Sequence, residues 1–235
     1  DVRAPSAVHD EQTLSGSLGP ALDPIFSLRK RVQLAPGATV RVNFVTLVAN
    51  TRDEVLAVAD RYRDVAVFEQ TVTQAWTRAQ VQLRHLGISP DEAHLFQRLA
   101  TRLLYVDPLL RAPQEVLQHN RRGPSALWAH GISGDRPIVL LRVDEGEARD
   151  IARQLLLAQD YWRMKGLIVD LVFLNEQQHS YYEHTQATLE ALGRARQAAA
   201  GSGADRGGVF TIKEAQVDAE DLRLLLTAAR VLLSS

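Results

Sequence analysis

The 235-residue sequence predicts a mixed fold of α+β and α/β character, organised in three parts that cover residues 1–50, 51–123 and 124–235. The first part has strand-like periodicity around a Pro-Gly turn, which is typical of an antiparallel β-hairpin. The second part has helical periodicity with residues that cap helix ends. In the third part continuous apolar runs alternate with helical segments, which indicates a parallel sheet covered on both faces.

The first part is predicted to form one β-hairpin. Its strands are Ile25–Gln33 and Thr39–Val48, on either side of a turn in which Pro36 presets φ and Gly37 accepts a positive φ. Two strands alone are only marginally stable in water, so the hairpin must pack on the helices or belong to a larger sheet. We favour the larger sheet, with its other strands upstream of this sequence.

The second part is predicted to be helical, with clear start signals. Thr51–Glu54 and Ser89–Glu92 each have the pattern of a capping box, in which a hydroxyl and a carboxylate satisfy exposed backbone N–H groups. Long helices are expected at Val65–Leu86 and Pro90–Tyr105, and a short turn or helix at Pro113–His119.

The third part is predicted to form a small three-stranded parallel α/β unit with right-handed crossovers. The expected strands are Ile138–Val143, Leu167–Leu174 and Val209–Ile212. The expected helices are Glu145–Lys165, Tyr181–Ala199 and Asp218–Leu233. Three strands make this smaller than a full nucleotide-binding sheet.

Composition excludes several classes of function. A net charge of −1 and a pI near 6.7 argue against nucleic acid and anionic membrane surfaces as partners, because these require a clustered cationic excess. The sequence has no cysteine, which excludes disulfides and thiolate metal sites.

The glycine-rich run Gly201–Gly208 follows a helix and precedes a strand, the reverse of the order in phosphate-binding loops. The histidines have no metal-binding spacing, and we expect no metal and no cofactor.

One local group of residues has the character of a sugar site, which needs carboxylates with cationic and aromatic side chains near them. It consists of Arg121, Arg122, Trp128, His130 and Asp135. The pattern Gly-x-x-Gly-Asp is also what a tight structural turn requires, and we favour the turn. Ser133 lacks the Gly-x-Ser-x-Gly context of a hydrolase nucleophile. We therefore predict no catalytic residue and treat the five as weak candidates for sugar binding.

Four separated segments, in the same order, resemble an internal stretch of the cyclic β-1,2-glucan synthases. They are Leu22–Arg29, Arg84–Asp91, Arg121–Pro137 (which contains Trp128-Ala-His-Gly-Ile-Ser-Gly-Asp135) and Tyr161–Asn175. The resemblance runs from about Gly16 to Leu233. It implies that the hairpin is the end of a β-sandwich and that the sequence is part of a longer membrane enzyme making cyclic glucan from UDP-glucose.

The segments that match do not include the glycosyltransferase motifs or the acid and phosphate-binding motifs of the phosphorylase-like region. Pro124 and Arg136 also depart from the glutamine and the apolar residue expected in the family. The resemblance therefore implies a non-catalytic scaffold or glucan-guiding segment. The alternatives are a phosphorylase- or hydrolase-like site around Asp135 and a protein-interaction module.

The same resemblance implies the surroundings of the segment. The expected partners are the remaining domains of the synthase and β-1,2-glucan, with no nucleic acid. The sequence lacks an apolar run of the roughly 18 residues that span a bilayer, so we expect a soluble segment without membrane insertion. Its expected location is the cytoplasmic side of an inner-membrane protein.

Overall fold

The computed structural model describes residues 27–143, 148–176 and 207–234, together with positions 13, 14, 16, 19, 20 and 191. The chain divides into two compact units, residues 1–68 and 69–235, which are described separately. The expected helix Tyr181–Ala199 lies, apart from position 191, outside the described residues, as does most of the glycine-rich run that follows it.

The first unit forms the expected turn. The N–H of Ala38 donates to the carbonyl of Ala35 at 3.0 Å, and Gly37 has a φ of 77°. The strands expected on either side of the turn are absent: residues 27–50 have no regular secondary structure apart from the turn, and large apolar side chains such as Phe44 and Val48 are exposed. The physical reason is that two strands without a third strand or a covering helix bury too little to be stable.

Helix α2 (Arg52–Arg61) belongs to the first unit and begins at the predicted capping box. The backbone N–H of Glu54 donates to the Thr51 hydroxyl at 3.3 Å, and the Glu54 carboxylate accepts the Thr51 N–H at the same distance. Helix α3 (Val65–Leu86) continues the chain into the second unit.

Helix α4 (Pro90–Leu104) begins at the second predicted capping box, in which the Ser89 N–H donates to the Glu92 carboxylate at 2.8 Å. This hydrogen bond is the main reason that the pKa of Glu92 lies below its ordinary value. Three short elements follow α4 along the chain: the 3₁₀ helix η1 (Pro108–Leu110), helix α5 (Gln114–His119) and the 3₁₀ helix η2 (Pro124–His130).

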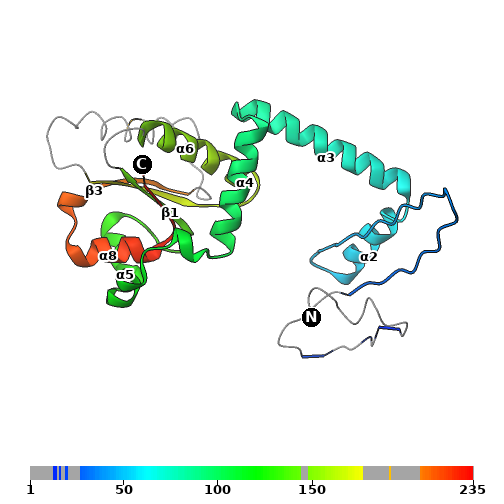
Figure 1. The fold of residues 1–235 in the computed structure, drawn as a ribbon, viewed down its shortest axis with the longest axis horizontal. Helices are drawn as coiled ribbons and strands as arrows, with labels where there is room; N and C mark the ends of the chain where they lie inside the picture. Colours follow the sequence, from blue (N-terminus) through cyan, green and yellow to red (C-terminus); the bar gives the residue numbers. More distant parts are fainter. Residues whose placement is uncertain are drawn as a thin grey trace. The chain divides into compact units, whose positions relative to one another are not determined.

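The second unit is built on a parallel sheet of four strands in the order β3-β2-β1-β4. The strands are β1 (Ile138–Val143), β2 (Asp170–Asn175), β3 (Val209–Lys213) and β4 (Ala229–Ser234). Between them lie α6 (Ala148–Met164), η4 (Glu214–Gln216) and α8 (Ala219–Ala228). Figure 1 shows α4 and α6 on one face of the sheet and α5 and α8 on the other.

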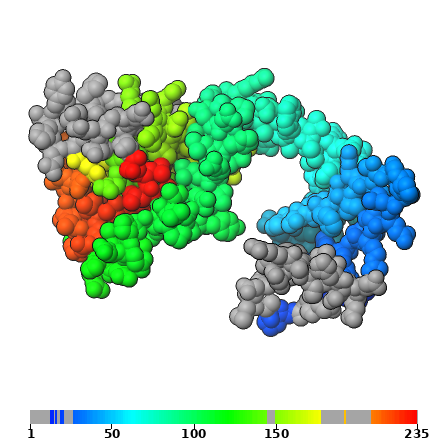
Figure 2. All heavy atoms as spheres, viewed as in Figure 1, coloured from blue at the N-terminus to red at the C-terminus, as the bar shows by residue number. Residues whose placement is uncertain are grey.

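The fourth strand corrects the prediction of a three-stranded unit. The helix expected at Asp218–Leu233 ends at Ala228, and the remaining residues pair with the second edge of β1, with Val231 opposite Val139. A central strand with one unpaired edge would leave buried backbone groups without partners, so pairing overrides the helical propensity of this leucine-rich segment. In Figure 2 the C-terminal strand, in red, reaches the surface beside the green segment that includes η1, which it contacts.

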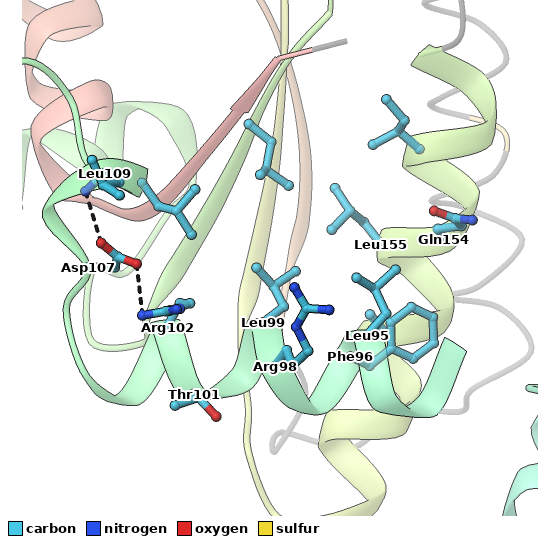
Figure 3. Close-up of a pocket in the computed structure, with 14 residues that line it drawn as sticks. Leu95, Phe96, Arg98, Leu99, Thr101, Arg102, Asp107, Leu109, Gln154 and Leu155 are labelled. Atoms are coloured by element: carbon cyan, nitrogen blue, oxygen red, sulfur yellow. Dashed lines mark hydrogen bonds and ion pairs between the residues drawn. The ribbon is translucent and has the colours of Figure 1, made fainter. Parts of the chain in front are cut away.

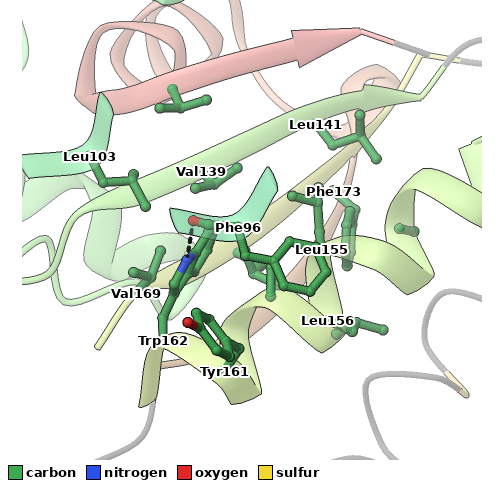
Figure 4. Packing of buried hydrophobic residues seen from close by; sticks show 14 of the residues in the cluster. Phe96, Leu103, Val139, Leu141, Leu155, Leu156, Tyr161, Trp162, Val169 and Phe173 are labelled. Carbon is green, nitrogen blue, oxygen red and sulfur yellow. Dashed lines mark hydrogen bonds between the residues drawn. The ribbon is translucent and has the colours of Figure 1, made fainter. Parts of the chain in front are cut away.

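One hydrophobic cluster joins α4 and α6 to the face of the sheet that carries Val139. Two of its aromatic members, Phe96 and Trp162, are 2% and 1% exposed. The indole N–H of Trp162 donates to the carbonyl of Phe96 at 2.8 Å (Figure 4). The centroids of the Phe96 and Tyr161 rings lie 6.1 Å apart. This buried hydrogen bond satisfies the indole and fixes how α4 lies against α6.

A second cluster covers the opposite face of the sheet. It joins η2 and α8 to alternate residues of β1 and β2, with Leu127, Leu140 and Leu225 fully buried. Because successive strand residues point to opposite faces, the two clusters together bury nearly all of β1. Only Arg142 of that strand is exposed.

Arg111 supports the junction between α8 and β4. Its guanidinium donates to the carbonyl of Ala229 at 2.5 Å and to that of Thr227 at 2.9 Å, where the helix ends. The register between β1 and β4 shifts at this same point. Partial burial lowers the pKa of Arg111, and the charge of Arg230 adds to this shift.

We expect Arg111→Met to destabilise the second unit by about 1–3 kcal/mol, because two partly buried carbonyls lose charge-assisted partners. Urea denaturation followed by circular dichroism measures this. Arg78→Met, an exposed arginine on α3, is the control and should change little. Equal stability of the two variants would contradict a supporting role for Arg111.

A buried carboxylate lies at the amino end of β2. Asp170 is 2% exposed, accepts the N–H of Gly208 at 2.7 Å and lies 3.9 Å from the guanidinium of Arg136. Burial raises the pKa of Asp170, and the hydrogen bond and Arg136 offset only part of the shift. The carboxylate thus fixes the start of β3 against β2, at a cost when it is ionised.

This raised pKa gives a prediction for Asp170→Asn, whose amide oxygen can still accept the Gly208 N–H. Because the pKa of Asp170 is higher in the folded state than in the unfolded state, this residue contributes most to wild-type stability below the ordinary pKa of aspartate. That contribution is lost as pH rises through the folded-state pKa. The variant should therefore gain stability relative to wild type as pH rises from about 4 toward neutral. Urea denaturation across this range tests it, with exposed Asp91→Asn as control. Parallel pH profiles for wild type and Asp170→Asn would refute it.

Candidate functional site

The candidate residues surround the loop that leads into β1, at the amino edge of the sheet. Gly131 ends η2 with a φ of 74°, and its N–H donates to the carbonyl of Trp128 at 3.0 Å. Gly134 has a φ of 80°, and a Cβ there would lie 3.3 Å from the Leu127 side chain. Both glycines are therefore needed for the turn itself.

Arg122 and His130 are brought together by Asp221 of α8, and Arg122 also pairs with Asp218, the residue that caps this helix. Sequence reasoning selected neither aspartate. The guanidinium of Arg122 binds the Asp221 carboxylate and lies 3.3 Å from that of Asp218. The second oxygen of Asp221 lies 3.2 Å from Nε2 of His130. This network, which we call the η2–α8 clamp, consists of Arg122, His130, Asp218 and Asp221.

Local chemistry at the start of α8 orients the clamp. Asp218 caps the helix by accepting the N–H of Asp221 at 2.7 Å. That hydrogen bond is the main cause of the lowered pKa of Asp218, and Arg122 adds to it. The hydrogen bond to Asp221 in turn raises the pKa of Arg122. The charges of Arg122 and the two aspartates are therefore engaged with one another.

The other three candidates lie outside the clamp. Arg121 and Asp135 are exposed, and the backbone N–H of Asp135 donates to the Ser133 hydroxyl at 3.3 Å. Trp128 is 68% exposed, and its indole N–H donates to the Ser133 carbonyl at 3.1 Å. The ring is thus anchored at one edge while most of its surface faces solvent.

The arrangement is poorly suited to acid–base chemistry on a sugar. Asp135 lies close enough to Asp170 to contribute to the raised pKa of that buried group, a combination that superficially suits a carboxylate pair. Asp170, however, is 2% exposed and hydrogen-bonded to Gly208, so a glycosidic oxygen cannot reach it. Among the described residues, no group of three or more His, Asp or Glu side chains could hold a metal ion.

Comparison with known proteins identifies the relatives of the chain. Residues 1–65 match the family model of the glycosyl hydrolase 94 supersandwich domain. Over 218 residues, 93% of the chain, the sequence is 40% identical to the cyclic β-(1,2)-glucan synthase NdvB of Rhizobium meliloti (strain 1021). The chain is a relative of the cyclic β-1,2-glucan synthases. The resemblance predicted from the sequence is therefore confirmed.

The chain spans 8% of the length of that synthase. The supersandwich match covers the Pro36–Gly37 turn and the exposed apolar residues around it, which agrees with the predicted end of a β-sandwich. Among the residues that the structure describes, no helix combines the length and apolar character needed to cross a membrane.

We expect Asp221→Asn to lower the thermal midpoint, because it removes the charge that Arg122 and His130 share. Differential scanning fluorimetry measures this, with Glu115→Gln on α5 as an exposed control. Arg122→Gln should add little to the effect of Asp221→Asn, because both break one network. Fully additive effects would show that the two side chains are not coupled.

Proposed function

We propose that the chain is a non-catalytic scaffold and glucan-guiding segment of a cyclic β-1,2-glucan synthase. In this proposal the synthase makes cyclic β-1,2-glucan from UDP-glucose, and the transfer chemistry lies in its other domains. The observation that carries the guiding role is Trp128, which is 68% exposed and held at its indole N–H by the Ser133 carbonyl.

An anchored, exposed indole is a suitable platform for a pyranose ring. Its flat face offers apolar area to the C–H groups of a sugar, and the anchor reduces the side-chain entropy lost on binding. The exposed side chains of Arg121 and Asp135, on the same loop region, could hydrogen-bond sugar hydroxyls.

Two features support a non-catalytic role. The η2–α8 clamp engages Arg122 and His130, two of the cationic candidates that a phosphorolytic site at Asp135 would use. In addition, the loop lies at the amino edge of a parallel sheet, whereas ligand chemistry in open α/β sheets is found at the carboxyl edge. A phosphorylase- or hydrolase-like site at Asp135 is therefore the weaker proposal.

A protein-interaction role is a second candidate, and exposed apolar side chains favour it. Val72 and Trp76 of α3 are 54% and 65% exposed. Many apolar residues around the Pro36–Gly37 turn are also exposed. Large exposed apolar groups often mark protein interfaces. We propose the remaining domains of the synthase as these partners, which is compatible with a guiding role for Trp128.

We expect linear and cyclic β-1,2-glucans to bind the chain saturably, in the millimolar range or tighter, and Trp128→Ala to weaken binding at least about tenfold, or roughly 1.4 kcal/mol. Calorimetry or NMR titration measures this. Trp76→Ala removes an equally exposed indole from α3 and should leave affinity unchanged. Absence of binding by wild type at millimolar glucan would refute the guiding role and leave the scaffold role.

A further inference from the structure

A groove separate from the candidate loop lies between α4 and α6. It encloses about 590 Å³, a size in the range of small-molecule sites. Its walls are mainly apolar and include Leu95, Phe96, Leu99, Leu110, Ile151 and Leu155. Figure 3 shows these two helices facing each other across the cavity, with the sheet behind them.

The groove reaches the part of the sheet where ligands are usually found. Leu233, which lines it, is the penultimate residue of β4, and Ile151 and Leu155 come from the first half of α6. The strand order β3-β2-β1-β4 reverses direction between β1 and β4. In open α/β sheets this switch point, at the carboxyl ends of the strands, is the usual position of a binding site.

Two cations, Arg98 and Arg102, line this apolar groove. Arg98 is exposed, and the structure gives it no hydrogen bond or ion pair within the described residues. Its neighbour Arg102 is engaged with Asp107 at 2.9 Å. Figure 3 shows the Arg98 guanidinium between Leu95 and Leu99, directed toward the cavity. An anionic group at this position would gain a charge-assisted partner.

We propose that this groove binds a single-chain amphiphile, with its acyl chain along the α4–α6 walls and its anionic head group on Arg98. An acyl chain brings no polar atoms that need partners in the apolar interior, whereas an extended peptide would bring unsatisfied N–H and C=O groups. Leu109, which is 91% exposed at the rim, gains cover when the chain is bound. The proposal is independent of the glucan-guiding role of Trp128.

Saturated carboxylates test the proposal. Laurate, titrated below its micellar concentration by calorimetry, should bind the complete chain 1:1 with a Kd on the order of 100 µM. Affinity should rise about fourfold for each methylene from octanoate to laurate, because each buried methylene contributes the same transfer free energy. Dodecyltrimethylammonium, with the same tail and a cationic head, should bind at least about tenfold more weakly.

Two exposed positions allow variants that leave the core intact. Arg98→Glu should weaken laurate at least about tenfold and strengthen dodecyltrimethylammonium, while Arg78→Glu on α3 is the matched control and should change neither. Gln154→Trp, which fills the groove from an exposed position on α6, should abolish binding of both. Circular dichroism verifies that each variant is folded.

Absence of saturable laurate binding by wild type would overturn the proposal. So would equal affinity for the two head groups in wild type and Arg98→Glu, because that result indicates nonspecific adsorption. Retention of laurate binding in folded Gln154→Trp would place the ligand outside the groove and would also overturn it.

Discussion

The second unit depends on β1 being paired along both edges. Its backbone groups are buried between two hydrophobic clusters, so each must find a partner within the sheet. β2 supplies one edge soon after β1 in the chain, but the other edge is filled only when β4 returns from the C-terminal end. The central strand is therefore completed last in sequence order.

The charged contacts of this unit support that closure. Arg111 donates to carbonyls at the junction from α8 to β4, and the η2–α8 clamp connects the loop before β1 to the helix before β4. Asp170 connects the start of β2 to the start of β3 by accepting the Gly208 N–H. Each contact joins segments far apart in the chain, which is why local sequence patterns did not reveal the roles of Arg111 and Asp221.

Local chemistry, by contrast, was predictable. Both capping boxes, at Thr51 and Ser89, were expected from four-residue patterns and are present with their reciprocal hydrogen bonds. The turn at Gly37 was likewise expected from its own residues. β4 was missed because Ala219–Ser234 is rich in leucine and alanine throughout, so its change from helix to strand is set by the edge of β1 rather than by propensity.

The same distinction explains the candidate loop. Its glycines were correctly interpreted as turn residues, because positive φ is a local requirement. The five candidates were grouped by sequence proximity, yet the fold separates them: Arg122 and His130 turn inward to α8, whereas Trp128 remains at the surface. Arg122 and His130 are thereby given a structural task by a partner more than ninety residues away, whereas the exposed aromatic ring stays available for a ligand. Proximity in the chain identified the right loop, but tertiary pairing decides which of its side chains can act.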